Sequence, residues 1–439
     1  MREGKIMDQL LKKARTGLDT LVEGGAEQAV SSVSREVVRE INAEMGEFTL
    51  YRTLFKDSVN FMAIRDKKRG LSAQNDVTKE AIVKGAKLCL EAAEAADEDE
   101  AWQLAPKLPK QSFTTGPLFC DEEKLLSRSQ ELLDDIKEQF PNIMVEAFYA
   151  THSLKEGVAL FSTGSEFQST RGAYSIDLMF NAQEGKKTSS FYGSYALLDS
   201  LDEAFIKQGS IHYDLEFVSG QVHTQPAGEK YEGVILMTPS CLGSFLYSIL
   251  GNFVSDSVIL DGTSIWRDKL GQPVADPRFS LAIAPLSRGM VMGERFTPEG
   301  YLSEDYHVIR DGVLEKFAIS DYTARKTGRD RAPNNAFDNF VVEAGDTPLD
   351  EIIRGIDKGI LVGRFSGGNP GTSGDFSGVA KNTYLIENGE IKHALNETMV
   401  SGNLVQLLMN IRAISKEVIE DGSSVLPWIA FNDVIISGK

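Results

Sequence analysis

A loop rich in glycine, set between two strand-like runs, places the tightest local constraint on this chain. Ile360 to Val362 form an apolar run, and a second apolar run ends at Ile386. Between them, six of the thirteen residues from Ser366 to Gly378 are Gly or Pro, so the backbone can turn sharply and approach a ligand closely. Asn388-Gly389 then predicts a tight hairpin. The chain therefore returns on itself here as a series of strands.

Such a loop can bind phosphate, bind an extended peptide, or only turn a corner. No Lys-Ser/Thr pair follows a glycine at P-loop spacing, and the dinucleotide-binding pattern G-x-G-x-x-G does not fit the register of these glycines. The phosphate hypothesis is therefore poorly supported. For any single residue of the loop, a long turn is the simplest interpretation.

Length and charge limit the class of protein. At 439 residues the chain is too long for one ordinary core and predicts two or three domains. Its formal net charge of −18 argues against nucleic-acid binding, which needs a basic face toward the phosphates. The two basic runs, Arg65 to Arg69 and Arg325 to Arg331, are short and are interpreted as solvated turns.

The sequence indicates a cytoplasmic protein with no membrane contact. It shows no apolar run behind a basic start, and no stretch of about 18 apolar residues that could span a bilayer. Its three cysteines, Cys89, Cys120 and Cys241, are odd in number and widely spaced, which is typical of a reducing compartment.

Hydrophobic spacing predicts an α+β fold. Apolar residues at helical spacing from Ile6 to Leu21 indicate a first helix, and a further helix is expected from Asp121 to Phe140. The segment from Val30 to Ile41 fits either a helix or a strand. From Ile143 to Tyr195 the apolar residues alternate, which predicts an antiparallel meander. Additional helices are expected over Leu201 to Val218 and from Asn403 to Val418.

We predict two domains. The first, residues 1–222, has helices packed on a mostly antiparallel sheet, with possible sub-units 1–105 and 112–222 around an acidic, proline-containing linker. The second, residues 223–439, is β-rich with a few helices. A polar joint from Gln221 to Lys230 marks the boundary between them.

Four motifs carry a resemblance to a known family. They are Thr372-Ser373-Gly374-Asp375-Phe376-Ser377, the run Ile386 to Ile391, Ser401-Gly402-Asn403-Leu404, and the run Ser320 to Gly328. They resemble the PmbA/TldD family, and most closely its PmbA (TldE) branch, over nearly the whole chain. That family was named as modulators of DNA gyrase and later described as zinc-dependent proteases with inactivated homologues.

The resemblance implies that this chain lacks the zinc site. In the zinc-bearing branch a helix carries H-E-x-x-x-H, and these positions fall here on Leu242, Gly243 and Tyr247. A slip of one residue changes nothing, because no His or Glu occurs between Glu232 and Glu294. The five histidines of the chain never lie four or five residues apart. We therefore expect no cofactor in this chain and a zinc ion in a partner subunit.

The function implied is that of a metal-free subunit in a cytoplasmic TldD/TldE-type metallopeptidase complex acting on unfolded or extended peptides. The expected partner is a TldD-like, metal-bearing chain, with a homodimer possible when the chain is alone. By its position, the glycine-rich loop would face the closed chamber of such a complex. The peptide-binding candidates are Ser366, Gly367, Gly368, Asn369, Gly371, Thr372, Ser373 and Asp375.

Two other classes of function stay open. A stand-alone hydrolase could use Cys241, at a strand-to-helix junction, or Ser240, but each would need a base that the sequence does not reveal. With its apolar neighbours, Cys241 is better interpreted as a buried structural thiol. Asp375 could serve as an acid or base, or only cap its own loop. The remaining class is a non-enzymatic interaction protein of the gyrase-modulator type.

Overall fold

Long strands that pair along most of their length dominate the first half of the chain. The computed structural model describes residues 2–334 and 337–438. An eight-stranded sheet has the order β3-β2-β1-β5-β6-β4, and β7 and β8 also pair with β6. Its strands are β1 (Gln28–Glu44), β2 (Glu47–Arg65), β3 (Lys68–Gln74), β4 (Gln111–Thr115), β5 (Ile143–Phe161), β6 (Glu166–Glu184), β7 (Lys187–Thr188) and β8 (Tyr192–Leu198).

The segment from Val30 to Ile41, which fits a helix or a strand by its spacing, is a strand. It lies within β1, which is antiparallel to both of its neighbours, so that Val33 sits opposite Val59 of β2 and Val158 of β5. Pairing on both edges satisfies the backbone hydrogen bonds of β1, and its β-branched residues pack well on a pleated surface. Partners distant in sequence thus decide the conformation.

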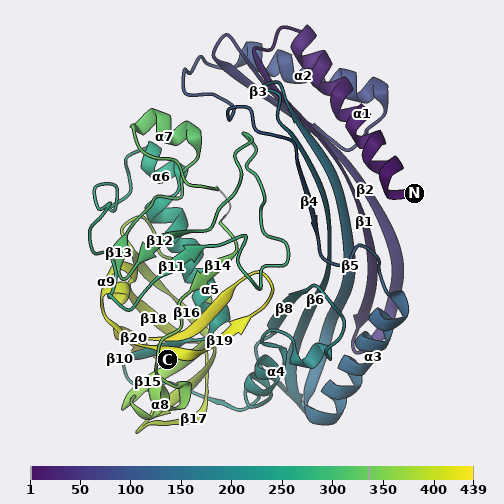
Figure 1. Ribbon diagram of the computed structural model, residues 1–439. Helices are drawn as coiled ribbons and strands as arrows, with labels where there is room; N and C mark the ends of the chain where they lie inside the picture. The colour runs from purple at the N-terminus through teal and green to yellow at the C-terminus, as the bar shows by residue number, and fades with distance from the viewer. Residues whose placement is uncertain (1, 335–336, 439) are drawn as a thin grey trace.

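Helices cover the two ends of the convex face of this curved sheet and leave its middle open, while the second half of the chain lies on the concave side (Figure 1). Residues of α1 and α2 form one apolar cluster with β1 and β2, and the predicted inward residues Leu10, Ala14, Leu18 and Leu21 are buried there.

The described helices are α1 (Arg2–Glu23), α2 (Lys79–Ala95), α3 (Glu122–Gln139), α4 (Ile211–Ser219), α5 (Pro239–Ile249), α6 (Asp256–Leu260), α7 (Asp321–Thr327), α8 (Leu349–Arg354) and α9 (Leu404–Met409).

A twelve-stranded sheet forms the second half. Its order is β13-β12-β11-β14-β20-β10-β15-β16-β17-β9; β18 also pairs with β16 and β20, and β19 pairs with β20. The strands are β9 (Thr224–Gln225), β10 (Tyr231–Met237), β11 (Leu281–Ile283), β12 (Tyr306–Arg310), β13 (Val313–Leu314), β14 (Phe340–Val342), β15 (Lys358–Ser366), β16 (Asp375–Glu387), β17 (Glu390–Leu395), β18 (Thr398–Asn403), β19 (Ile411–Glu420) and β20 (Val425–Ser437). The α+β fold class is confirmed.

The tight hairpin predicted at Asn388-Gly389 joins β16 to β17. Glu387 pairs with Glu390, and both turn residues have positive φ, 53° at Asn388 and 76° at Gly389. Two residues with positive φ match the twist of the flanking strands. This prediction is confirmed.

Two helix predictions are wrong in extent. The segment from Leu201 to Val218 contains a short 3-10 turn at Phe205–Lys207 and then α4, because Gly209 has a φ of 53° between them. The predicted long helix after Asn403 ends at Met409. The chain then continues as β19, where Ile411 and Ile414 pair with residues of β20. Asn403 does cap α9, accepting from the amides of Val405 and Gln406.

The two halves share an apolar core. One cluster contains Phe148 and Phe180 of the first sheet together with Leu236 and Trp428 of the second. The segment after Asp97, predicted as a linker, also joins the halves, because the Trp102 ring stacks on Tyr322 at a centroid distance of 3.6 Å. The predicted linker therefore packs against the second half, and the sub-unit limits 1–105 and 112–222 stay a prediction. The domain limits 1–222 and 223–439 stay a prediction.

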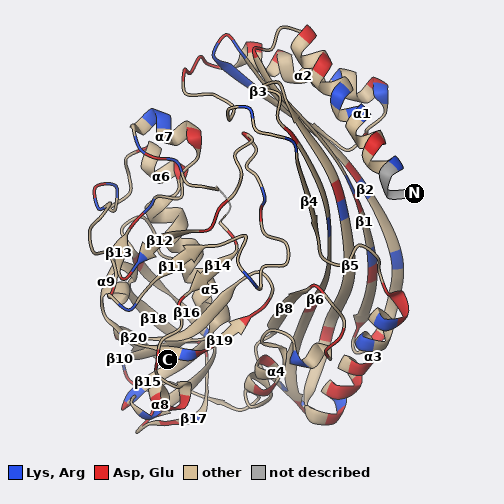
Figure 2. Cartoon of the chain, in the orientation of Figure 1, with Lys and Arg blue, Asp and Glu red and all other residues tan. Residues whose placement is uncertain are grey.

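Charged side chains are spread over the long strands and outer helices. In the view of Figure 2, segments with Lys or Arg alternate with segments carrying Asp or Glu, and the strands of the second half are mostly uncharged. Among the described residues, no helix has both the length and the apolar character needed to cross a membrane.

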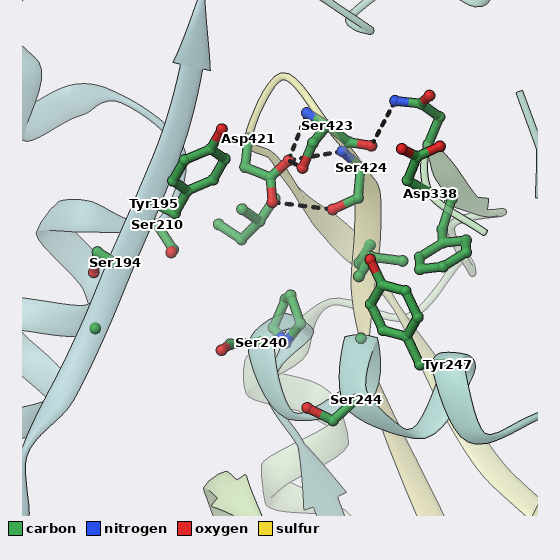
Figure 3. A pocket seen from close by; sticks show the side chains of 17 residues that line it. Ser194, Tyr195, Ser210, Ser240, Ser244, Tyr247, Asp338, Asp421, Ser423 and Ser424 are labelled. Carbon is green, nitrogen blue, oxygen red and sulfur yellow. Dashed lines mark hydrogen bonds between the residues drawn. The ribbon is translucent and has the colours of Figure 1, made fainter. Parts of the chain in front are cut away.

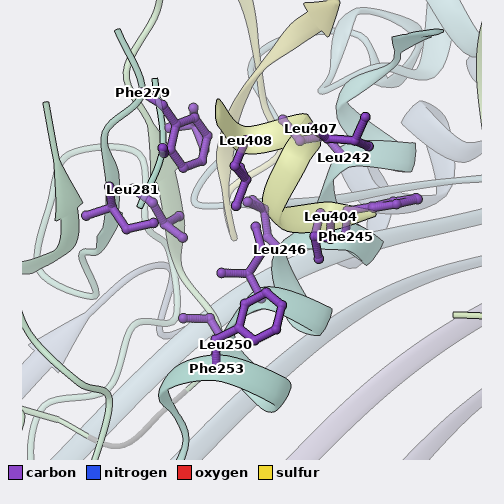
Figure 4. Close-up of a cluster of buried hydrophobic side chains, with 14 of the residues drawn as sticks. Leu242, Phe245, Leu246, Leu250, Phe253, Phe279, Leu281, Leu404, Leu407 and Leu408 are labelled. Carbon is purple, nitrogen blue, oxygen red and sulfur yellow. The ribbon is translucent and has the colours of Figure 1, made fainter. Parts of the chain in front are cut away.

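Helix α5 packs at the centre of the core of the second half. The apolar side of α5 enters this core through Leu242, Phe245 and Leu246 (Figure 4). The same cluster contains Phe279, Leu281 and the apolar residues of α9. Leu246, Ile249 and Phe253 are at most 1% exposed and belong to this core. Phe253 follows α5 and lies against Trp266, with ring centroids 4.6 Å apart.

Replacement of Phe253 by alanine is expected to lower the free energy of unfolding by roughly 3–5 kcal/mol, because it removes a fully buried ring and leaves a cavity. Chemical denaturation measures this difference. Phe119→Ala is the matched control, since Phe119 is 77% exposed and its loss should change stability little. Equal effects of the two substitutions would show that α5 and its extension are peripheral to the core.

Candidate active-site cavity

Helix α5 divides its residues between the core and a cavity. Strand β10 ends at Met237, and the Thr238 hydroxyl caps the helix by accepting from the Cys241 amide at 3.3 Å. Pro239 takes the first helical position, where no amide donor is needed. The apolar side of α5 enters the core, so Gly243, Ser244 and Tyr247 are left to line a cavity of about 330 Å³.

The other walls of this cavity come from three distant segments. Ser194 and Tyr195 belong to β8, Asp338 and Asn339 precede β14, and the turn between β19 and β20 contributes Asp421. Tyr195 and Tyr247 lie on opposite sides of the cavity, with Asp421 between them (Figure 3). The cavity therefore exists only where the two halves of the chain meet.

Asp421 organises the turn that closes one side. Its Oδ1 accepts from the backbone amides of Ser423 and Ser424 at 2.8 and 2.7 Å, and also from the Ser423 hydroxyl. Its Oδ2 accepts from the Ser424 hydroxyl at 3.0 Å. Four donors hold this carboxylate in place.

A second carboxyl group lies directly behind the wall. Ser194 and Ser210, which both line the cavity, donate their hydroxyls to Oδ2 of Asp214 at 2.6 Å each. Asp214 is only 2% exposed. Burial raises the pKa of its carboxyl to about 7, although the two serine hydrogen bonds act in the opposite direction.

The side chains around α5 do not fit a zinc ion. Zinc sites use several His, Cys, Asp or Glu ligands, whereas α5 offers glycine, serine and tyrosine to the cavity. Within residues 2–334 and 337–438, no three such ligand side chains come together. The expected absence of a metal in this chain stays a prediction, because only a metal count tests it.

The three positions aligned with the zinc motif do not share one face of α5. Leu242 is 2% exposed and packs in the core, whereas Tyr247 is 54% exposed and lines the cavity. Moving the alignment forward by one residue gives Gly243, Ser244 and Ser248, and all three positions are accessible. Accessibility favours the shifted alignment, because ligands of one ion must reach a common point, but the positions Leu242, Gly243 and Tyr247 are not tested and the register stays a prediction.

The glycine-rich loop lies beside the far end of α5 and does not line the cavity. Strand β15 ends at Ser366 and β16 begins at Asp375, so the remaining candidates, Gly367 to Ser373, form the connection. Asn252 donates to the Pro370 carbonyl at 2.8 Å, which joins the loop to the turn after α5. The assignment of the eight loop candidates as peptide contacts stays a prediction.

Asp375 stabilises the loop locally. Its carboxylate accepts from the Asn403 amide at 2.9 Å and from the Ser373 hydroxyl at 3.0 Å. These bonds lower the pKa of Asp375. A carboxylate held in this way suits the capping interpretation better than a role as acid or base.

Cys241 is a structural thiol. It is 1% exposed, and burial raises the pKa of its thiol to about 12, the opposite of what a nucleophile needs. Cys89 is likewise buried against β3 and donates to the Gly70 carbonyl. Ser240 does line the cavity, yet no histidine among the described residues lines it with Ser240.

Sequence reasoning did not identify most of the cavity. Tyr195, Asp338 and Asp421 line it from three segments that lie apart from α5 in the sequence and carry no motif, and Asp214 lies behind its wall on α4. The only local signal is Ser210 four residues before Asp214 on a short helix. Their proximity depends on the packing of the two halves.

Comparison with known proteins agrees with this architecture. Residues 230–438 match the family model described as the PmbA/TldA metallopeptidase C-terminal domain. A metalloprotease from Archaeoglobus fulgidus is 27% identical over 52% of this chain and 53% of its own length. A zinc metalloprotease TldD homologue from Saccharolobus solfataricus is 22% identical over 68% of each chain.

The crystal structure of TldE from Thermococcus kodakarensis superimposes with a TM-score of 0.83 over 97% of this chain and 99% of that chain, at 21% identity. At that identity the likeness shows the fold alone. The chain therefore has the fold of TldE, and its residues 230–438 match the PmbA/TldA metallopeptidase C-terminal domain, which agrees with the family resemblance that its motifs predicted. The sequence matches to the first curated relatives span 42–53% of their length.

Asp214 gives a pH dependence with a definite sign. A carboxyl whose pKa is raised from 3.8 to about 7 on folding binds a proton more tightly in the folded state. Its contribution to stability is therefore fully present below about pH 4 and is lost as the pH rises to about 7. The loss is on the order of 4 kcal/mol for a shift of this size.

Unfolding free energies of the wild type and Asp214→Asn, measured from pH 4 to pH 8, test this expectation. Asparagine keeps an oxygen for both serine donors but has no proton to lose. The unfolding free energy of the wild type minus that of the variant should fall between pH 4 and 7 and should stay constant above pH 7. A difference that is constant across this range would show that Asp214 does not titrate there.

Proposed function

We propose that this chain is the metal-free, TldE-like subunit of a cytoplasmic two-chain metallopeptidase that acts on unfolded or extended peptides. A TldD-like partner chain would hold the zinc ion. The single observation that carries the proposal is the accessible face of α5. Where the zinc-bearing branch has its ligands, this face presents Gly243, Ser244 and Ser248.

The helix keeps its structural role without its metal ligands. Its apolar side is packed as tightly as any part of the core, and its open side still borders a cavity between the two halves. This combination is what a subunit needs when it has lost catalysis but still shapes a shared chamber. The fold of TldE over nearly the whole chain, and the similarity to a zinc metalloprotease TldD homologue, support the proposed pairing.

The cavity is suited to a polar, extended ligand. Its described lining includes the hydroxyls of Ser240 and Ser244, while those of Ser423 and Ser424 already donate to Asp421 and are left to accept. Hydroxyl groups both donate and accept, so they can follow a peptide backbone without selecting one sequence. The glycine-rich loop, where glycines let another backbone approach closely, would extend this surface within the complex.

The alternatives are less well supported. The buried Cys241 with its raised pKa argues against a cysteine hydrolase, and Ser240 lacks a neighbouring histidine base among the described residues. A purely regulatory protein of the gyrase-modulator type remains compatible with the acidic charge, but no specific contact in the described residues favours it.

Elemental analysis of the purified chain tests the metal-free assignment. We expect less than about 0.1 zinc per chain, against about one in a TldD-type partner purified in the same way. The partner is the positive control for the purification. About one zinc per chain, lost when Ser244 and Ser248 are replaced by alanine, would contradict the proposal.

Gly371→Val tests the role of the glycine-rich loop. A side chain at Gly371 would have no atom within 4 Å, so neither stability nor assembly should change. If the loop contacts the peptide, cleavage of an unstructured peptide by the reconstituted pair should fall several-fold. Turnover at the wild-type rate with normal assembly would leave the loop as a long turn, and lost assembly would place it in the subunit interface.

Gly368→Val is the control for structural damage. Gly368 has a φ of 55°, and a side chain there would lie 1.6 Å from the Ser377 carbonyl oxygen. This variant should distort the loop and lower stability and cleavage together.

A further inference from the structure

The cavity beside α5 is negatively charged. Two carboxylates, Asp338 and Asp421, line it, and no Lys, Arg or His does so among the described residues. Neither carboxylate forms an ion pair with a described residue. Arg171, which does not line the cavity, acts electrostatically on Asp338 against the effect of burial and donates to the Gly293 carbonyl.

Asp338 is the group with the most to gain from a bound cation. Burial of its carboxyl raises the pKa despite Arg171, and the residue as a whole is exposed, so a bound cation can reach it. Asp421, by contrast, is fixed by its four donors from Ser423 and Ser424. The cavity thus combines a carboxylate held by four hydrogen bonds with an exposed carboxylate that forms no ion pair with a described residue.

Aromatic rings add a second kind of attraction. Tyr247 packs edge-to-face on Phe340 with ring centroids 4.8 Å apart, and Tyr195 lies on the opposite side of the cavity (Figure 3). No hydrogen bond of either tyrosine hydroxyl to a described residue is present, so both remain available to a ligand. Aromatic faces attract ammonium and guanidinium groups, more strongly when water is excluded.

We propose that this cavity binds a cationic side chain, lysine or arginine, of the extended peptide that the complex handles. That the ligand is a peptide rests on the proposed function, whereas the positive charge of its side chain is inferred from the cavity itself. A volume of about 330 Å³ is near the lower limit for ligand pockets, which suits one long side chain better than a folded segment. Asp338 and Asp421 would pair with the charge, and Tyr195 and Tyr247 would contact the methylene stem.

A thiol placed in the cavity can measure this charge directly. We choose Ser244→Cys in the full chain, with Cys120→Ser added because Cys89 and Cys241 are already buried. We compare how fast the thiol of Ser244→Cys reacts with two methanethiosulfonate reagents, the cationic aminoethyl and the anionic sulfonatoethyl compound. Ser248→Cys, on the same helix but outside the cavity lining, is the matched reference site.

The ratio of cationic to anionic rates should be roughly tenfold higher at Ser244→Cys than at Ser248→Cys. Adding Asp338→Asn should remove most of this excess. Asp8→Asn, which removes an exposed charge on α1, should leave it unchanged. Equal ratios at the two sites, or equal effects of the two asparagine variants, would overturn the proposal, since net charge alone would then explain the selectivity.

The same thiol reports on peptide binding. An unstructured peptide of Gly, Ala and Ser with one central lysine should slow modification of Ser244→Cys by a neutral reagent, and the norleucine version should not. Equal protection by both peptides overturns this inference and leaves the peptide-handling role standing. Protection by neither counts against both.

Discussion

The burial of one side of α5 is the interaction on which the site depends. Leu242, Leu246 and the following Phe253 pack into the core of the second half, and this fixes the rotation of the helix about its axis. Because side chains of a helix are spaced by about 100°, the residues left on the open side are then determined. Gly243, Ser244 and Tyr247 face the cavity as a consequence of core packing. A helix held in this way can lose its metal ligands without losing its place.

The cavity itself depends on the long strands of the first half. Strands β5 and β6 pair over most of their length, so the sheet extends past the second half and carries β8 to the cavity wall. An apolar cluster containing residues of both halves keeps the walls together. The buried Asp214 connects Ser194 of β8 to Ser210 before α4 on the same side. Two halves that moved independently could not maintain these contacts.

The sequence predicted what local patterns determine. The first helix and the Asn388-Gly389 hairpin follow from spacing and turn chemistry, and both are present; Cys241 is buried, as its apolar neighbours predicted. The prediction was wrong where pairing with a distant strand determines the conformation. Ile411 and Ile414 have helical spacing in the sequence, but they pair with residues of β20. The cavity could not be predicted for the same reason, since Tyr195, Asp338 and Asp421 carry no shared motif. The family motifs identified the helix, and the register of its zinc-motif positions stays a prediction.

Photo-crosslinking from the open face of α5 tests most directly whether this helix now contacts peptide instead of metal. Benzoylphenylalanine would be placed at Ser244, or at the exposed Phe119 as a reference, and the chain assembled with a TldD-like partner and an uncleaved peptide. The account predicts a peptide adduct from position 244 and none from position 119. Adducts to the partner chain alone, or equal peptide adducts from both positions, would contradict it.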